Sequence, residues 1–110
     1  MSQNFRNFID GKWMDSTSGE TFDNVNPANK DEILSTFPRS GPQDVDLAVQ
    51  AARKALKGWS KVTPPSRGRI LFEAGRIMSE KKTELARTLV KEVGKTMNEA
   101  LGEVKAAVDM

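Results

Sequence analysis

The side chains available for chemistry in this chain are mainly carboxylates and lysines, because the sequence contains no cysteine and no histidine. Disulfides, a thiolate nucleophile and the common zinc sites are therefore excluded within these 110 residues. The acidic residues nearest to a pattern are Glu92, Glu99 and Glu103. Glu99 and Glu103 would share a helix face, where a carboxylate pair can bind a cation or share a proton. Lys95 and Lys105 are close enough to offset the charge, so we favour a solvated helix face.

Gly94-Lys95-Thr96 has the ending of a phosphate-binding P-loop, but the rest of that motif is missing. The motif needs a glycine five residues before Gly94, where this sequence has Leu89, and it needs a preceding strand. We interpret Gly94 as the end of one helix, and Thr96 with Glu99 as the capping box that starts the next. The glycines also lack the spacing of a dinucleotide fingerprint, so the residues indicate no nucleotide-binding motif.

Two groups of large side chains have both a functional and a structural interpretation. Arg67, Arg69 and Arg76 could bind an anion, although salt bridges with the neighbouring acidic residues are favoured. Trp13 and Trp59 could belong to a ligand site, but we favour core or interface packing because tryptophan buries much apolar area.

The elements that would position these residues begin with short strands. Asp10-Gly11 predicts a β-hairpin with a type I′ turn, which needs positive φ at both central residues. Ser16 to Gly19 predicts a second turn. Two further strands are expected at Thr21 to Val25 and Glu32 to Phe37.

Helical periodicity begins after Pro38 and predicts four helices. The first is expected to be capped by Ser40 with Gln43, and to end before Pro64-Pro65. The second would follow Ser66, the third would be capped by Thr83, and the fourth would start at the Thr96 capping box. Gly75, inside the second helix, is expected to mark a close helix contact.

Composition indicates one small folded domain. Charged residues make up 29% of the chain, hydrophobic residues 37%, and no apolar run approaches the roughly 18 residues that span a bilayer. The net charge is only +2 and no basic stripe carries interleaved aromatic residues, so neither nucleic acid nor membrane is an expected partner. The first residues lack the apolar core of a secretory signal, so we expect a cytoplasmic location.

The last predicted helix has a start signal but no stop signal before Met110. We therefore expect the chain to be the front part of a larger protein, with the reactive groups outside it.

A series of short motifs runs along the whole chain. In chain order they are Phe8-Ile9-Asp10-Gly11-Lys12-Trp13, Val25-Asn26-Pro27-Ala28 with Glu32-Ile33, Ala48 to Ala55 with Trp59-Ser60, Ser66 to Leu71, Glu92-Val93-Gly94-Lys95, and Glu99 to Val104. Each motif is short, but in this order they resemble the NAD(P)-dependent aldehyde dehydrogenase superfamily, and the common order makes the resemblance specific.

The resemblance implies an α/β fold in which a short N-terminal β-hairpin or meander is followed by four helices. This would be the first part of a Rossmann-like cofactor domain. Residues 1–39 would hold the hairpin and short strands, and residues 40–110 the helical part of the incomplete N-terminal cofactor-binding domain. Without the resemblance, strands followed by helices are typical of α+β proteins.

The family that the chain resembles oxidises aldehydes to carboxylic acids with NAD or NADP, through a cysteine thiolate and a glutamate-activated water. The motifs with those residues follow the matching segment. No catalytic or cofactor-binding residue is therefore assigned, and the chain alone is expected to be inactive. The parent enzyme would act on a small aldehyde as a homo-dimer or tetramer. The alternative is a truncated or split fragment that acts as a non-catalytic interaction module.

Many members of this family bind a monovalent cation through backbone carbonyl groups. The matching positions are Val25, in the Val-Asn-Pro motif, and Glu92, just before Gly94-Lys95. The resemblance therefore implies a sodium or potassium site at Val25 and Glu92.

Overall fold

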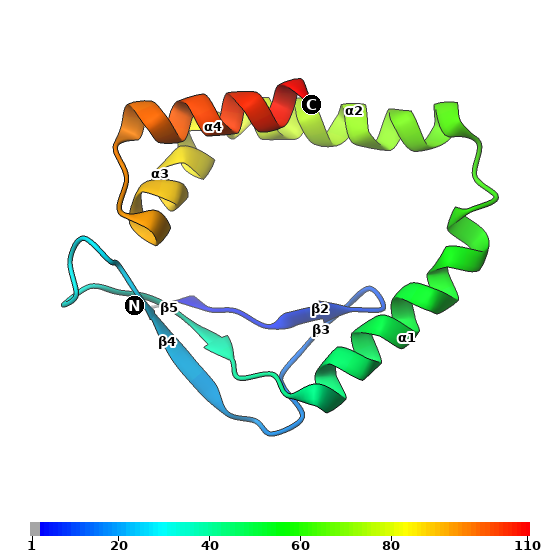
Figure 1. The fold of residues 1–110 in the computed structure, drawn as a ribbon, viewed down its shortest axis with the longest axis horizontal. Helices are drawn as coiled ribbons and strands as arrows, with labels where there is room; N and C mark the ends of the chain where they lie inside the picture. Colours follow the sequence, from blue (N-terminus) through cyan, green and yellow to red (C-terminus); the bar gives the residue numbers. More distant parts are fainter. Residues whose placement is uncertain (1–2) are drawn as a thin grey trace. The chain divides into compact units, whose positions relative to one another are not determined.

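The computed structural model describes residues 3–110, which form five strands and four helices (Figure 1). All the strands precede all the helices along this part of the chain, as the sequence predicts. The chain divides into two compact units. The first unit combines the chain up to Val25 with Ile33–Val62, and the second combines Asn26–Glu32 with Thr63–Met110.

The hairpin of the first unit consists of β2 (Asn7–Ile9) and β3 (Lys12–Met14), paired antiparallel. Asp10 and Gly11 have φ values of 51° and 76°, which confirms the predicted turn with positive φ at both central residues. On the hairpin, the rings of Phe8 and Trp13 lie 4.8 Å apart between centroids.

A second sheet in this unit has the strand order β1-β5-β4. β4 (Thr21–Val25) pairs antiparallel with β5 (Ile33–Pro38), close to the predicted bounds, while β1 (Gln3–Asn4) pairs parallel with β5. Phe37 stacks on Phe5 and Phe22 at centroid distances of 5.0 and 6.0 Å. Aromatic pairs across neighbouring strands therefore hold this small sheet together.

The first helix, α1 (Pro42–Trp59), is capped differently from the prediction. Its N-cap is Gly41, and the Ser40 hydroxyl instead accepts a hydrogen bond from Asn7 Nδ2 at 2.8 Å. Asp44, buried at 5% exposure, accepts hydrogen bonds from the backbone N–H groups of Gly41 and Thr17, both at 2.8 Å. Its Oδ1 also accepts the Thr17 hydroxyl at 2.5 Å. One carboxylate therefore caps α1 and fixes the turn after β3.

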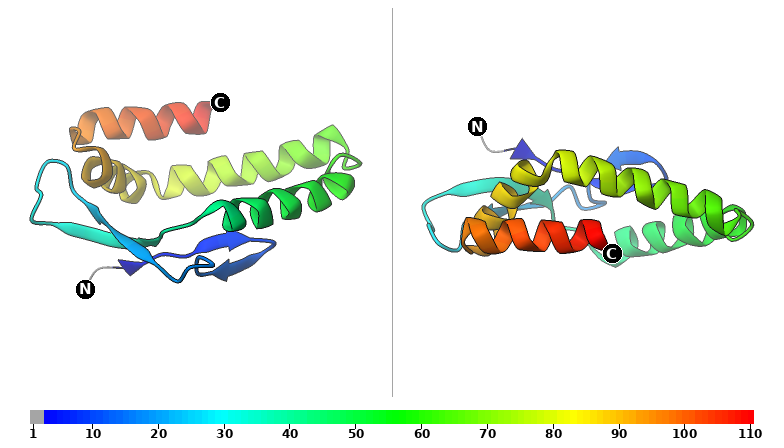
Figure 2. Two further views of the ribbon diagram at one scale, coloured as in Figure 1. Left: turned by 60° about the horizontal axis from the view of Figure 1, so that its bottom comes forward. Right: turned by 90° about the horizontal axis from the view of Figure 1, so that it is seen from above.

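The second unit contains α2 (Pro64–Glu80), α3 (Lys82–Val93) and α4 (Met97–Asp109), with α4 running antiparallel beside α2 (Figure 2). Its core consists of Ala86, Ala100 and Val104, which are the buried hydrophobic residues within residues 3–110. A Cβ placed on Gly75 would lie 3.7 Å from the Val108 carbonyl oxygen of α4. Gly75 thus faces α4, as expected, but at an ordinary van der Waals distance that an alanine would also satisfy.

Two predicted helix starts in this unit were wrong. α2 begins at Pro64, two residues before Ser66, because prolines lose nothing in a first turn whose N–H groups have no helical partner. α3 begins at Lys82, so Thr83 is not its cap. The single residue Lys81 ends α2 and also serves as the N-cap of α3, which leaves no loop in which Thr83 could cap.

Candidate functional site

The acidic residues singled out in the sequence have separate structural partners. Glu99 completes the predicted capping box: its carboxylate accepts the Thr96 hydroxyl at 2.8 Å and the Thr96 N–H at 3.2 Å. These bonds hold the pKa of Glu99 below its usual value. Glu103 forms an ion pair with Lys95. Glu99 and Glu103 are thus used in structural contacts, and within residues 3–110 no three acidic side chains gather as a metal site would need.

A cluster of polar contacts lies in the turn Asn26–Glu32. Asn26 is 9% exposed, and its side-chain oxygen accepts the Ala28 N–H at 2.9 Å. Its amide nitrogen donates to Glu32 Oε2 at 2.8 Å, and its backbone N–H donates to the Glu32 carbonyl at 3.0 Å. Asn26 therefore closes the turn from both ends, which explains why the Val-Asn-Pro motif needs an asparagine here.

This turn is fixed to the C-terminal end of α3. Glu32 Oε1 forms an ion pair with Lys91 Nζ at 2.7 Å. The hydrogen bond from Lys91, and then that from Asn26, lower the pKa of Glu32. Gly94, which ends α3 with φ of 73°, lies against Pro27, and a Cβ at Gly94 would approach Pro27 Cγ to 3.2 Å. A methyl group at Gly94 would therefore require Pro27 to shift by a few tenths of an ångström.

The geometry confirms that Gly94-Lys95-Thr96 is a helix end followed by a helix start. The Gly94 N–H donates to the Val90 carbonyl at 2.9 Å, and Thr96 is the N-cap of α4. The segment before Gly94 is helical, whereas a P-loop follows a strand. This part of the chain has no phosphate cradle.

The two residues named for a cation fall in different units. Val25 is the last residue of β4 in the first unit, and Glu92 lies in the last turn of α3 in the second. A helix C-terminus carries partial negative charge on its last carbonyl groups, which suits a cation at Glu92. The cation site at Val25 and Glu92 stays a prediction.

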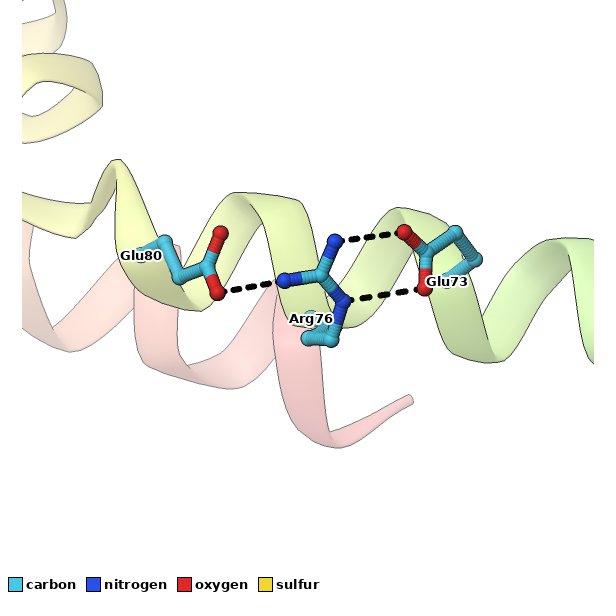
Figure 3. A network of polar contacts seen from close by, with 3 residues as sticks. All are labelled: Glu73, Arg76 and Glu80. Atoms are coloured by element: carbon cyan, nitrogen blue, oxygen red, sulfur yellow. Dashed lines mark hydrogen bonds and ion pairs between the residues drawn. The ribbon is translucent and has the colours of Figure 1, made fainter.

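Of the three arginines singled out in the sequence, Arg76 is used for ion pairs. Arg76 lies between two carboxylates on one face of α2 (Figure 3). Its Nε and Nη2 bond the Glu73 carboxylate at 2.9 and 2.5 Å, and its Nη1 pairs with Glu80. Arg69 donates to the Ser66 hydroxyl at 3.2 Å. The (i, i+3) and (i, i+4) pairs support the favoured salt-bridge interpretation for Arg76.

The tryptophans do not lie in the core of this chain. Trp13 is 65% exposed and Trp59 is 43% exposed. Of the two favoured interpretations, core packing was wrong within residues 3–110, and interface packing stays a prediction.

The sequence profile of the aldehyde dehydrogenase family matches residues 13–110. The chain belongs to the aldehyde dehydrogenase family. Three relatives are similar in sequence. The α-ketoglutarate semialdehyde dehydrogenase of Haloferax volcanii is 40% identical over the whole chain, which covers 23% of that protein. The malonate-semialdehyde dehydrogenase of Bacillus subtilis is 44% identical over 94% of the chain and 21% of its own length. The D-glyceraldehyde dehydrogenase (NADP(+)) of Picrophilus torridus is 42% identical over 93% of the chain and 20% of its own length.

Solved structures of the family share the fold. An NAD-dependent aldehyde dehydrogenase from Sinorhizobium meliloti superposes with a TM-score of 0.93 at 33% identity, covering 99% of this chain and 22% of that enzyme. A betaine aldehyde dehydrogenase from Staphylococcus aureus, solved with NAD+, gives a TM-score of 0.87 at 31% identity, covering 91% of this chain and 20% of that enzyme. The α/β fold class expected from the resemblance is thus confirmed, and the chain spans about a fifth of the length of these relatives.

None of the helices in residues 3–110 combines the length and hydropathy that a bilayer span requires. The Asn26–Glu32 turn is the part of the site that sequence reasoning missed. The Val-Asn-Pro motif marked its position, but no local pattern connected Glu32 with Lys91, which follows 59 residues later.

Proposed function

We propose that this chain is the first part of the cofactor-binding domain of a dehydrogenase that oxidises aldehydes to carboxylic acids with NAD(P)+. The observation that carries the proposal is the superposition of 99% of the chain on an NAD-dependent aldehyde dehydrogenase at a TM-score of 0.93. Both predicted segments, residues 1–39 and residues 40–110, would belong to that one domain.

The role of the chain in such an enzyme is to form part of the scaffold. The chemistry of the family requires a thiolate that adds to the aldehyde carbonyl, and this sequence contains no cysteine. When bound, the nicotinamide accepts the hydride. The polar residues of this chain instead hold its backbone in place. Asn26, Glu32 and Lys91 connect the Val-Asn-Pro turn to α3. The chain alone is therefore expected to be inactive.

The remaining features of the parent enzyme are part of the same proposal. NAD or NADP serves as the hydride acceptor, a sodium or potassium ion is bound at Val25 and Glu92, and the complete enzyme is a cytoplasmic homo-dimer or tetramer. The cation is supported by the family resemblance and by the partial negative charge at the end of α3. Replacing the sodium and potassium salts in the buffer with a salt of a large organic cation should lower the thermal stability of the parent enzyme. Unchanged stability would refute the cation.

The aldehyde is a small molecule, and this segment alone does not reveal which one. The three relatives are named for three different aldehydes, yet their identities to this chain are 40, 44 and 42%. The overall similarity of this segment therefore does not identify which aldehyde the complete enzyme oxidises.

The test uses the purified 110-residue chain and the complete gene product from the source cells. With NAD+ or NADP+ and a panel of aldehydes, the isolated chain should give no absorbance of reduced cofactor, and a longer gene product containing this segment should give a steady increase. Turnover by the isolated chain would refute the scaffold role, and an inactive longer product would refute the proposed reaction.

A second candidate is a non-catalytic interaction module. It is favoured by the exposure of large apolar side chains, such as Leu71 at 72% and Phe72 at 85% in α2. An antibody against this segment decides between the two. A native product of 12.2 kDa would support the module, and a mass several-fold larger would support the parent enzyme.

A further inference from the structure

The Asn26–Glu32 turn connects two strands of the first unit, although its own contacts group it with the second unit. β4 ends at Val25 and β5 begins at Ile33, and these two residues are partners in the sheet. No residue separates the turn from the strand on either side. The turn is therefore covalently continuous at both ends with paired strands of one unit, while its contacts are those of the other unit.

Hydrogen bonds inside the turn make it stiff. The Asn29 N–H donates to the Asn26 carbonyl at 3.1 Å, and the Glu32 N–H donates to the Asn29 carbonyl at 3.0 Å. The Asn26 N–H donates to the Glu32 carbonyl at 3.0 Å, and the Asn26 side chain adds bonds to the Ala28 N–H and the Glu32 carboxylate. Since these groups are already paired, the turn has few alternative conformations and transmits a displacement rather than absorbing it.

Two contacts tie this stiff turn to the end of α3. Glu32 Oε1 pairs with Lys91 Nζ at 2.7 Å, and the two side chains are 35 and 55% exposed. The turn also packs closely against Gly94, where an added Cβ would lie 3.2 Å from Pro27 Cγ and 3.5 Å from Ala28 Cβ. Because Lys91 lies in the last turn of α3 and Gly94 is its C-cap, the turn is fixed to that end of the helix.

The chain passes between the units a further time at residues 62–63, and the hydrogen bonds there are short-range. The N–H groups of Ser60, Lys61 and Val62 bond to carbonyl groups three or four residues earlier. The Thr63 hydroxyl donates to the Ser66 hydroxyl at 3.0 Å. Such bonds shape the connection locally, whereas Glu32 and Lys91 are 59 residues apart in the sequence.

We propose that the Asn26–Glu32 turn and Lys91 form a latch that makes the two units unfold together. While the ion pair is in place, α3 cannot unfold without releasing a turn whose two ends continue the paired strands β4 and β5. Without the pair, the helices of the second unit lose this side-chain link to the turn, and each unit follows its own transition. The latch acts on the folding of this chain, independently of the reaction that the complete enzyme carries out.

The test is urea denaturation of the 110-residue chain, followed by two probes. Both tryptophans of the chain, Trp13 and Trp59, lie in the first unit, so their fluorescence reports that unit. The second unit holds α2, α3 and α4, three of the four helices in residues 3–110, so circular dichroism at 222 nm reports mainly that unit. The two midpoints should coincide in the wild-type chain, as they do for a single cooperative transition.

Lys91→Met removes the ammonium group and keeps a long side chain that favours a helix. The two midpoints should then separate by about 0.5 M urea, the shift expected when an exposed ion pair is lost. Lys105→Met is the matched control, since it removes the ion pair between Lys105 and Asp109 within α4 of the same unit. Its midpoints should stay coincident.

Glu32→Gln breaks the same ion pair from the side of the turn and keeps an oxygen that can accept from Asn26. It should separate the midpoints as Lys91→Met does, and it serves as the test if Lys91→Met does not fold. Coincident midpoints in a folded Lys91→Met or Glu32→Gln chain would overturn the latch. Separate midpoints in the wild-type chain or in Lys105→Met would also overturn it, because the units would then separate for another reason.

Native-state hydrogen exchange is a second measurement, and it needs no global unfolding. The N–H groups of Ala28 and Glu32 are hydrogen-bonded inside the turn. They should exchange about fivefold faster in Lys91→Met than in the wild-type chain, because the turn opens more often once it is released from α3. In Lys105→Met their exchange should be unchanged. Equal exchange in the wild-type and Lys91→Met chains would refute the latch.

Discussion

Replacing Gly94 by alanine should destabilise the chain, since two features of the structure oppose a side chain there. The φ of 73° lies in the left-handed region, where a non-glycine residue costs about 1–2 kcal/mol. In addition, the new Cβ would lie 3.2 Å from Pro27 Cγ and 3.5 Å from Ala28 Cβ, so the Asn26–Glu32 turn would have to move. We therefore expect a loss of about 2 kcal/mol or more in the free energy of unfolding.

The assay is urea denaturation followed by far-ultraviolet circular dichroism, with two other glycines as controls. Gly19 has φ of 70° and open space around its Cβ position, so Gly19→Ala should show the backbone cost without the steric one. Gly102 lies inside α4 with open space, so Gly102→Ala should stabilise by about 0.5–1 kcal/mol. The reasoning is refuted if Gly94→Ala is as stable as the wild-type chain. A loss no larger than that of Gly19→Ala would remove the contact with Pro27 from the explanation.

Asp44→Asn should lower the melting temperature at neutral pH. The Asp44 carboxylate accepts hydrogen bonds from Thr17 and Gly41, whereas the asparagine NH2 group would face the same N–H and O–H donors without an acceptor. The hydrogen bond from the Thr17 side chain is the main cause that lowers the pKa of Asp44 in the folded chain. The stabilisation of the folded chain by the Asp44 carboxylate is therefore complete above the pKa of the unfolded chain, and it is lost as the pH falls through the lower folded pKa. The two proteins should thus melt alike below that folded value; a difference that persists there would contradict this account. Thr96→Ala should cost about 1 kcal/mol in urea denaturation through loss of the α4 cap, whereas Thr96→Ser should be nearly neutral; equal losses would show that the hydroxyl is not the cap.

The hydrophobic core of this chain is small, and membership of the aldehyde dehydrogenase family helps to explain its size. Within residues 3–110 the buried hydrophobic side chains are Ala86, Ala100 and Val104, while Trp13, Leu71 and other large apolar residues are exposed. A domain that was complete in itself would bury more of its large apolar side chains. In the Sinorhizobium meliloti enzyme, the matching segment is only 22% of a much larger protein.

The sequence alone determined the features that depend on bonds between near neighbours. Asp10-Gly11 specified the hairpin turn because few other residue pairs adopt positive φ twice, and Thr96 with Glu99 specified a helix start because their mutual bonds span three residues. Gly94 marked a helix end for the same kind of reason. The motif order also identified the family and the position of the Val-Asn-Pro turn.

Only the tertiary structure decided which distant groups meet. The cap of α1 is Gly41 with Asp44 rather than Ser40 with Gln43, and the same carboxylate also binds Thr17, 27 residues earlier. Glu32 fastened its turn to α3 through Lys91, and β5 took the centre of its sheet between β1 and β4. A sequence does not show which exposed lysine will pair with which exposed carboxylate. It also does not show which strands will pair at a given strand edge. The choice among such partners is made by the packing of the whole chain, which no local pattern records.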